Sequence, residues 1–329
     1  MTTPVMAYPQ FAPSEQDAYR EQFDAGLQAL PAGLVVKARQ LLDKLSPVEW
    51  PVEWHLPWWL GRDFGLTTQC VQTLTLCNLF GLGYVRIEDE MVEESAGQAG
   101  RQGKRRLADA LYDQAMLRLS SLFGDQGEFW GQKDLAMSQW QRALNEGEHA
   151  PASRFADWTE NDLLLLAWRG APIKITAVGA CLLAGCKDAI PALLVSLDHM
   201  LIAQVLLDHL DDWSADLDAG RFNAFVAFVS DLPQTARHRD ANRRQVMQEF
   251  FLGDAGASYV DLTRRHIQTA LRYAEAVPCS GLEHYLAGYD TRIAASELAL
   301  RSQIRGWLHH ASAELFALPE PIDDATPPL

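Results

Sequence analysis

Cysteine is scarce, and its spacing indicates neither a metal site nor a disulfide framework. The five cysteines are scattered along 329 residues, and their spacings match no zinc-binding pattern. An odd number leaves at least one thiol unpaired, which is typical of a reducing compartment where cysteines serve as small apolar side chains. We therefore expect a cytoplasmic protein.

Basic residues are also scarce relative to acidic ones. The chain has 28 lysines and arginines against 43 aspartates and glutamates, and so a formal net charge of −15. Most of its surface would repel a phosphate backbone, which argues against nucleic acid as a partner. A small anion is still compatible with this charge, because clustered carboxylates can hold divalent cations that in turn hold the anion.

Long uninterrupted hydrophobic runs are absent. Residues 1–16 have neither a basic opening nor a continuous apolar run, so we expect no signal peptide. The apolar stretch 173–207 is interrupted by lysines, aspartates and a histidine. We therefore expect two buried helices there and no integral membrane segment.

Strand-like alternation with hairpin turns is absent too, and apolar residues recur with helical periodicity instead. Helix starts are indicated at Ser14 and Thr159, each followed by acidic residues. No repeat or long linker divides the chain. The sequence predicts an all-α protein, a single-domain bundle of roughly ten or more helices around a central cavity. We expect the domain to span 14–316, with flexible tails at 1–13 and 317–329.

One acidic segment stands out against its apolar surroundings. LLDHLDDWSADLDAG, residues 206–220, carries five aspartates. On a helix, Asp208, Asp212 and Asp216 form one carboxylate stripe, which costs about 0.2–0.5 kcal/mol per like-charged pair. A solvated helix end is the alternative, but MLIAQVLL just upstream is apolar all round and is expected to be buried. We interpret the stripe as ligands for a hard divalent cation.

A second acidic cluster follows another apolar run. In GLGYVRIEDEMVEES, residues 81–95, Asp89 and Glu93 lie four positions apart on one helical face, and Glu90 lies on the neighbouring face. Two buried helices that end in carboxylates can face each other across a cavity mouth and share Mg²⁺ ions. Such ions would bind a diphosphate.

The two segments resemble the aspartate-rich motifs of the class I isoprenoid synthase superfamily, which includes trans-prenyltransferases and terpene cyclases. The resemblance runs from about Trp54 to Arg221. DEMVE is similar to the first motif, with glutamate in place of aspartate at two positions, and QVLLDHLDDWSAD is similar to the second. The resemblance assigns catalytic roles to Asp89, Asp208 and Asp212, and metal ligation to these three together with Glu90, Glu93 and Asp216.

The resemblance also implies Mg²⁺, up to about three ions, with Mn²⁺ as an alternative, and an allylic prenyl diphosphate as substrate. It places Lys174, Gln204 and Arg221 at the substrate, although the Lys174 stem could equally pass along a helix end. Phe80 and Tyr84 would lie below the metals, where a ring face can stabilise a carbocation by about 0.5–2 kcal/mol. Core packing is the alternative for both rings, and the aromatic-rich segment EWHLPWWLG, residues 53–61, is assigned to packing alone.

The reaction class depends on the number of anion sites. Elongating members of the superfamily bind a second diphosphate with extra basic residues, including an Arg-Arg pair soon after the first motif. Here Arg101, Lys104, Arg105 and Arg106 follow only after a glycine-containing stretch. We therefore expect a terpene synthase-like lyase that quenches the cation by cyclisation, proton loss or water. The alternatives are a trans-prenyltransferase using isopentenyl diphosphate, a non-catalytic partner subunit of an isoprenoid synthase, and an unrelated metal-binding bundle; a homodimer is expected by resemblance.

Overall fold

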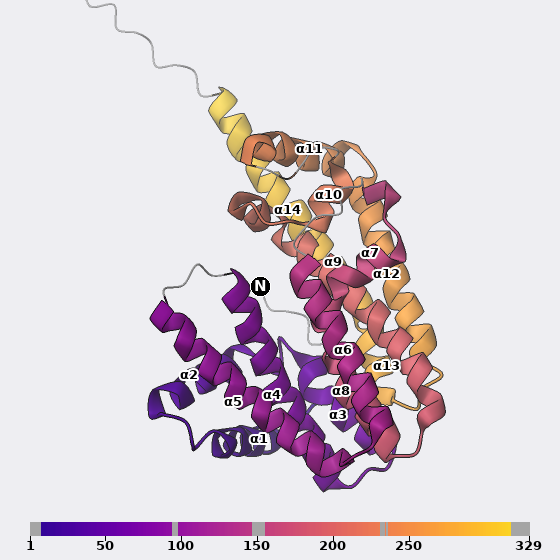
Figure 1. Ribbon diagram of the computed structural model, residues 1–329. Helices are drawn as coiled ribbons and strands as arrows, with labels where there is room; N and C mark the ends of the chain where they lie inside the picture. The colour runs from indigo at the N-terminus through magenta and orange to yellow at the C-terminus, as the bar shows by residue number, and fades with distance from the viewer. Residues whose placement is uncertain (1–7, 94–97, 147–154, 231–233, 235, 317–329) are drawn as a thin grey trace, which may run out of the picture.

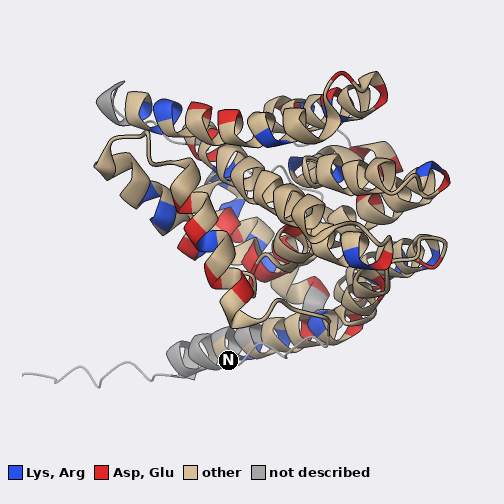
Figure 2. Ribbon diagram, turned by 90° about the horizontal axis from the view of Figure 1, so that it is seen from below, with Lys and Arg blue, Asp and Glu red and all other residues tan. Residues whose placement is uncertain are grey.

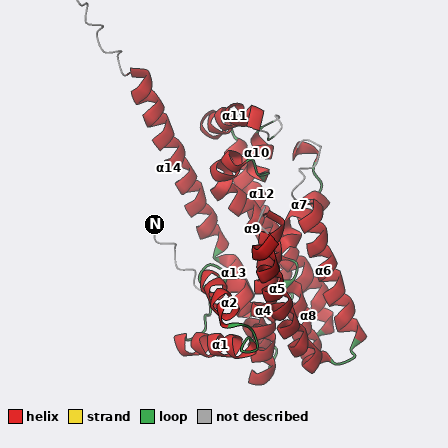
Figure 3. Ribbon diagram, turned by 60° about the vertical axis from the view of Figure 1, so that its left-hand side comes forward, coloured by secondary structure: helices red, strands yellow, loops and turns green. Residues whose placement is uncertain are grey.

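The computed structural model describes residues 8–93, 98–146, 155–230, 234 and 236–316. Every regular element in these ranges is helical, and none of them is a strand (Figure 3). The predicted all-α fold is confirmed. The α-helices are α1 (Pro13–Gly26), α2 (Ala32–Lys44), α3 (Pro51–Asp63), α4 (Thr68–Glu93), α5 (Gln98–Phe123), α6 (Gly127–Glu146), α7 (Glu160–Ala167), α8 (Ile173–Leu183), α9 (Ile190–Ala219), α10 (Ala224–Val229), α11 (Arg239–Leu252), α12 (Ala255–Ala274), α13 (Ser280–Ala287) and α14 (Tyr289–Phe316).

Helix α9 is the central helix of the larger core cluster (Figure 1). It contacts α7, α8, α10, α12 and α14. Ile202, Leu206 and Leu207 have no exposed surface, and burying one such side chain stabilises the fold by about 1.5–3 kcal/mol. Its acidic end is therefore held at a defined place.

Helices α4 and α5 form the wall on the other side. They run antiparallel, because Lys104 lies beside Glu90 while the Cys77 thiol lies 3.7 Å from the Ala115 carbonyl. A second core cluster joins them to α1 and α2, with Phe23 and Phe80 among its buried residues. The α4 helix thus has one face on this cluster and another facing α8 and α9.

Residues 8–12, which we expected in the N-terminal tail, pack on α3. The Trp59 indole donates a hydrogen bond to the Pro9 carbonyl at 2.8 Å, and the Tyr8 ring lies edge-on to Trp59 at 5.7 Å. Helix α1 begins at Pro13 with Ala12 as its N-cap, so the cap expected at Ser14 is wrong. The rest of both expected tails, 1–7 and 317–329, lies outside the described residues.

Helices α8 and α9 occupy most of the apolar stretch 173–207, and both are largely buried. The prediction of two buried helices is confirmed. By length and hydropathy one described segment, 187–219, could cross a membrane. The bent pair 160–170 and 173–183 would count as a second only if its 82° bend lay within one span.

The contact between α3 and α13 generates a stability prediction. A Cβ placed on Gly281 would lie 2.2 Å from Cγ of the fully buried Trp59. We expect Gly281→Ala to lower the free energy of unfolding by about 1–3 kcal/mol through overpacking. Gly33→Ala is the control, because nothing lies within 4 Å of its Cβ, and it should raise stability by up to about 1 kcal/mol. Urea denaturation measures both, and an unchanged midpoint for Gly281→Ala would contradict the packing described.

Candidate functional site

A cavity of about 280 Å³ lies between the N-terminal helices and the α9 core. Its lining comes from α3 to α9 and from the short 3₁₀ turn Trp168–Gly170 between α7 and α8. Most of the wall is apolar, with Val85, Met116, Leu119 and Ile173 among its residues. Its polar part combines three carboxylates with three cations, which is the composition of a ligand site with a few oriented polar groups.

Each predicted acidic motif contributes one carboxylate to this cavity. Asp89 comes from the last turns of α4 and is buried, and Asp208 comes from α9. Tyr84, one turn before Asp89, and Gln204, one turn before Asp208, line the cavity too. The Gln204 amide donates to the Tyr285 hydroxyl at 3.2 Å, which holds it in place.

Asp208 lies where solvent reaches the cavity, with 61 % of its side chain exposed. Its Oδ1 is 3.5 Å from Nη2 of Arg292 on α14. Loss of hydration beside the surrounding protein raises the pKa of Asp208 to about 6. Arg292 opposes this increase, whereas repulsion from Asp211 and Asp212 adds to it. A cation bound here would relieve the same repulsion.

The other two aspartates of the stripe have different surroundings. Asp212 is exposed on the next turn of α9 and does not line the cavity. Asp216 is buried and accepts hydrogen bonds from Arg221 at 2.9 Å and Asn223 at 2.8 Å. Asn223 also caps α10, so Asp216 and Arg221 fasten the end of α9 to the next helix.

The remaining acids of the first motif lie away from the cavity. Glu90 pairs with Lys104 at 2.9 Å, and Glu93 belongs to the last turn of α4, with its side chain outside the described set. Arg105 pairs with Glu88 at 3.0 Å, and Arg101 donates to the Met91 carbonyl at 3.1 Å. The basic residues after the motif therefore contact the acidic end of α4.

Lys174 and Phe80 are also outside the cavity lining. The buried Lys174 ammonium pairs with Asp198 and donates to Gln139 at 3.1 Å. Burial lowers its pKa although Asp198 opposes this. Phe80 stacks on Phe23 at 4.5 Å in the second core cluster. Both side chains thus have structural partners of their own.

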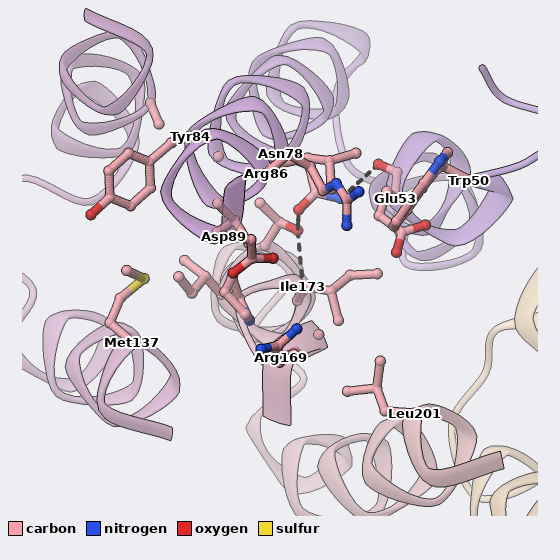
Figure 4. Close-up of a pocket in the computed structure, with 18 of the residues that line it drawn as sticks. Trp50, Glu53, Asn78, Tyr84, Arg86, Asp89, Met137, Arg169, Ile173 and Leu201 are labelled. Carbon is pink, nitrogen blue, oxygen red and sulfur yellow. Dashed lines mark hydrogen bonds between the residues drawn. The ribbon is translucent and has the colours of Figure 1, made fainter. Parts of the chain in front are cut away.

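Sequence reasoning missed the third carboxylate, Glu53 on α3. It belongs to the aromatic-rich segment assigned to packing, yet it lines the cavity and projects toward the same space as Asp89 (Figure 4). No other described side chain hydrogen-bonds or ion-pairs with its carboxylate. Burial raises its pKa to about 7, and the charge on Asp208 contributes while Arg292 opposes. The only signal in the sequence is a lone acid among buried aromatics.

The three cations that line the cavity are Arg86, Lys133 and Arg169. The Arg86 guanidinium lies 5.3 Å from the centre of the Trp50 ring, and Lys133 is 3.0 Å from Asp134. Figure 2 shows acidic and basic positions side by side on neighbouring helices over the whole fold. What distinguishes the cavity is that both signs face one largely apolar space.

The donor chemistry of the cavity fits Mg²⁺ bound together with a phosphorylated ligand. No set of three or more His, Cys, Asp or Glu residues in the described ranges could hold an ion by itself. Mg²⁺ is usually held by one or two carboxylates, with waters and substrate phosphates as the other ligands. Asp89 and Asp208 offer such oxygens from two helices.

No family model matches the chain, and no curated protein matches it either. The function is therefore argued from the geometry and the residue chemistry of the cavity.

The raised pKa of Glu53 generates a pH-dependent prediction for the ligand-free protein. The folded state disfavours the charged form, so the penalty is full above about pH 7 and declines as the pH falls toward the ordinary pKa of 4.5. We expect Glu53→Gln to raise the free energy of unfolding by on the order of 1–3 kcal/mol at pH 8 and by much less at pH 5. Urea denaturation at both pH values measures the effect.

The matched control is Glu49→Gln, the same substitution at an exposed position just before α3. It should change stability little at either pH. An equal effect of Glu53→Gln at pH 5 and pH 8 would contradict the environment described for Glu53.

Proposed function

We propose that this protein is a Mg²⁺-dependent class I terpene synthase-like enzyme. Its substrate is an allylic prenyl diphosphate, which it ionises, and the cation is quenched by cyclisation, proton loss or water. The observation that carries the proposal is that Asp89 and Asp208, one from each acidic motif, line the same largely apolar cavity.

The charged groups divide into metal ligands and diphosphate partners. Asp89 and Asp208 would hold Mg²⁺. Asp212 lies one helical turn after Asp208 on α9 and would add a further carboxylate ligand. Bound Mg²⁺ supplies positive charge that stabilises the departing diphosphate. Arg86 and Arg169 add fixed positive charge at the same cavity, so less charge must be reorganised when the carbon–oxygen bond breaks.

The apolar wall would receive the hydrocarbon tail. Met116, Leu119 and Ile173 line that part of the cavity, and an apolar lining protects a carbocation from premature capture by water. The Tyr84 ring lines the same space and can stabilise positive charge by about 0.5–2 kcal/mol through its face. These features support a reaction in which the cation survives long enough to rearrange.

The surroundings of the basic residues favour one diphosphate substrate over two. Arg101, Lys104 and Arg105 contact α4, where Glu88 and Glu90 pair with two of them. A second diphosphate would need cations beyond those that balance the carboxylates of the cavity. This supports a lyase over a trans-prenyltransferase.

The test is to incubate the full-length protein with geranyl, farnesyl and geranylgeranyl diphosphates singly, with and without isopentenyl diphosphate. Released diphosphate and organic products are both measured, and EDTA provides the metal-free control. We expect Mg²⁺-dependent release and a hydrocarbon or alcohol from a single substrate. Longer diphosphates formed only with isopentenyl diphosphate would instead indicate a prenyltransferase, and no release from any substrate would overturn the proposal.

Loss of either cavity aspartate should abolish turnover without unfolding the protein. We expect Asp89→Asn and Asp208→Asn each to lower kcat/KM by about 100-fold or more, because each removes charge that binds the metal. Asp17→Asn, an exposed aspartate on α1, which contributes no residue to the cavity lining, is the control and should retain activity. Diphosphate release and circular dichroism measure the two properties, and activity within a few-fold of the parent would contradict the assignment.

Tyr84 and Phe80 should differ in their effect on products. Tyr84 lines the cavity, whereas Phe80 lies against Phe23 in the second core cluster. We expect Tyr84→Leu to change the product distribution, and Phe80→Leu to lower stability by about 1 kcal/mol or more while leaving the distribution unchanged. Gas chromatography with mass spectrometry and urea denaturation check the pair, and altered products from Phe80→Leu alone would contradict the cavity lining.

A further inference from the structure

A cation formed in the cavity must lose a proton if the product is an olefin. The acceptor has to lie inside the cavity, because general bases act over hydrogen-bond distance. Three described carboxylates line it, namely Glu53, Asp89 and Asp208. Two of them belong to the acidic motifs that the proposed function assigns to Mg²⁺, which leaves Glu53 as the carboxylate without an assigned role.

Glu53 is placed at the cavity by the packing of α3. Its neighbours Val52 and Trp54 have no exposed surface, and the Trp54 indole donates to the Leu45 carbonyl at 2.6 Å. Helix α3 cannot rotate without breaking these contacts. The Glu53 side chain therefore projects toward the cavity rather than into either core (Figure 4).

A hydrogen-bonded relay fixes the same turn from the opposite side. The Asn78 amide of α4 donates to the Glu53 carbonyl at 2.6 Å, and its own oxygen accepts from the Thr176 hydroxyl of α8 at 3.0 Å. The Asn78 side chain thus links the backbone of Glu53 on α3 to Thr176 on α8. The carboxylate is left for a ligand, since no other described side chain hydrogen-bonds or ion-pairs with it.

We propose that Glu53 is the catalytic base that takes the proton from the carbocation and so directs the reaction to an olefin. The step rests on the proposed function. A C–H bond next to the cationic carbon breaks, its electron pair becomes the new π bond, and the proton passes to a Glu53 carboxylate oxygen. Glu53 returns this proton to water at the cavity mouth before the next substrate binds.

The environment of Glu53 suits this cycle. Burial raises the pKa of its carboxyl, which makes the Glu53 carboxylate a stronger proton acceptor than an exposed glutamate. The apolar wall keeps other acceptors away from the hydrocarbon. Without the Glu53 carboxylate, the acceptors that remain are the metal-bound groups and the released diphosphate, and water at the cavity mouth competes with them as a nucleophile. The product should therefore shift from olefin towards alcohol.

The experiment compares full-length parent, Glu53→Gln, Glu53→Asp and Glu49→Gln proteins on whichever of geranyl, farnesyl or geranylgeranyl diphosphate the parent turns over. Diphosphate release and the olefin-to-alcohol ratio are measured in the same reactions. We expect Glu53→Gln to keep diphosphate release within about threefold of the parent while the ratio falls by about tenfold or more. Glu53→Asp should recover part of the ratio, and Glu49→Gln should match the parent.

The two readouts separate failure of this proposal from failure of the proposed function. An unchanged olefin-to-alcohol ratio in Glu53→Gln, or a parent that makes only alcohol, would overturn the role of Glu53 while leaving the ionisation intact. Loss of diphosphate release in folded Glu53→Gln would likewise overturn it, by assigning Glu53 to substrate binding. No diphosphate release from the parent would overturn both proposals together.

Discussion

The burial of α9 on nearly every side determines where the carboxylates of the cavity can lie. Apolar side chains such as Ile202, Leu206 and Leu207 are fully enclosed by the surrounding helices, so the helix can neither slide nor rotate without exposing them. Asp208 follows directly on this apolar run, and it therefore emerges at the cavity. Helix α4 has the same design on the opposite wall, where its apolar turns lead to Asp89.

Charge pairing then decides which acids stay available to a ligand. Arg221 and Asn223 bind Asp216 at the end of α9, and Lys104 binds Glu90 beside α5. These contacts stabilise the fold, and they occupy two carboxylates that the motif pattern alone predicts to be metal ligands. Asp208 contacts Arg292 and is partly exposed, yet loss of hydration beside the surrounding protein raises its pKa, as it does that of Glu53. Raised pKa values are typical of acids that face a ligand site.

Local signals were enough to predict the helical fold, while the site needed tertiary structure. Thr159 is the N-cap of α7 as expected, and Asp162 accepts a hydrogen bond from its backbone amide at 2.7 Å. An apolar run that ends in acids also placed Asp89 and Asp208 at one cavity. A helical stripe with four-residue spacing, however, turns by about 40° at each step, so Asp208 and Asp216 face different surroundings.

The ion-pair partner of Lys174 and the cavity carboxylate Glu53 could not be predicted from the sequence, because both depend on how helices pack. The Lys174 pair with Asp198 joins α8 to α9, and sequence spacing contains no information on that approach. Glu53 was missed because its aromatic neighbours predict packing, and they do pack. Its role at the cavity arises only where α3 meets α4 and α8.

The central claim is that Asp89 and Asp208 act as one site for a divalent cation and a diphosphate. Crystals of the full-length protein soaked with Mn²⁺ and inorganic diphosphate, and measured for anomalous scattering of manganese, test it most directly. The account predicts anomalous peaks at the cavity mouth in contact with both Asp89 and Asp208, with the diphosphate bridging the metal to Arg86 or Arg169. Peaks confined to the exposed acids elsewhere on the helices, or a cavity that holds neither ion, would contradict it.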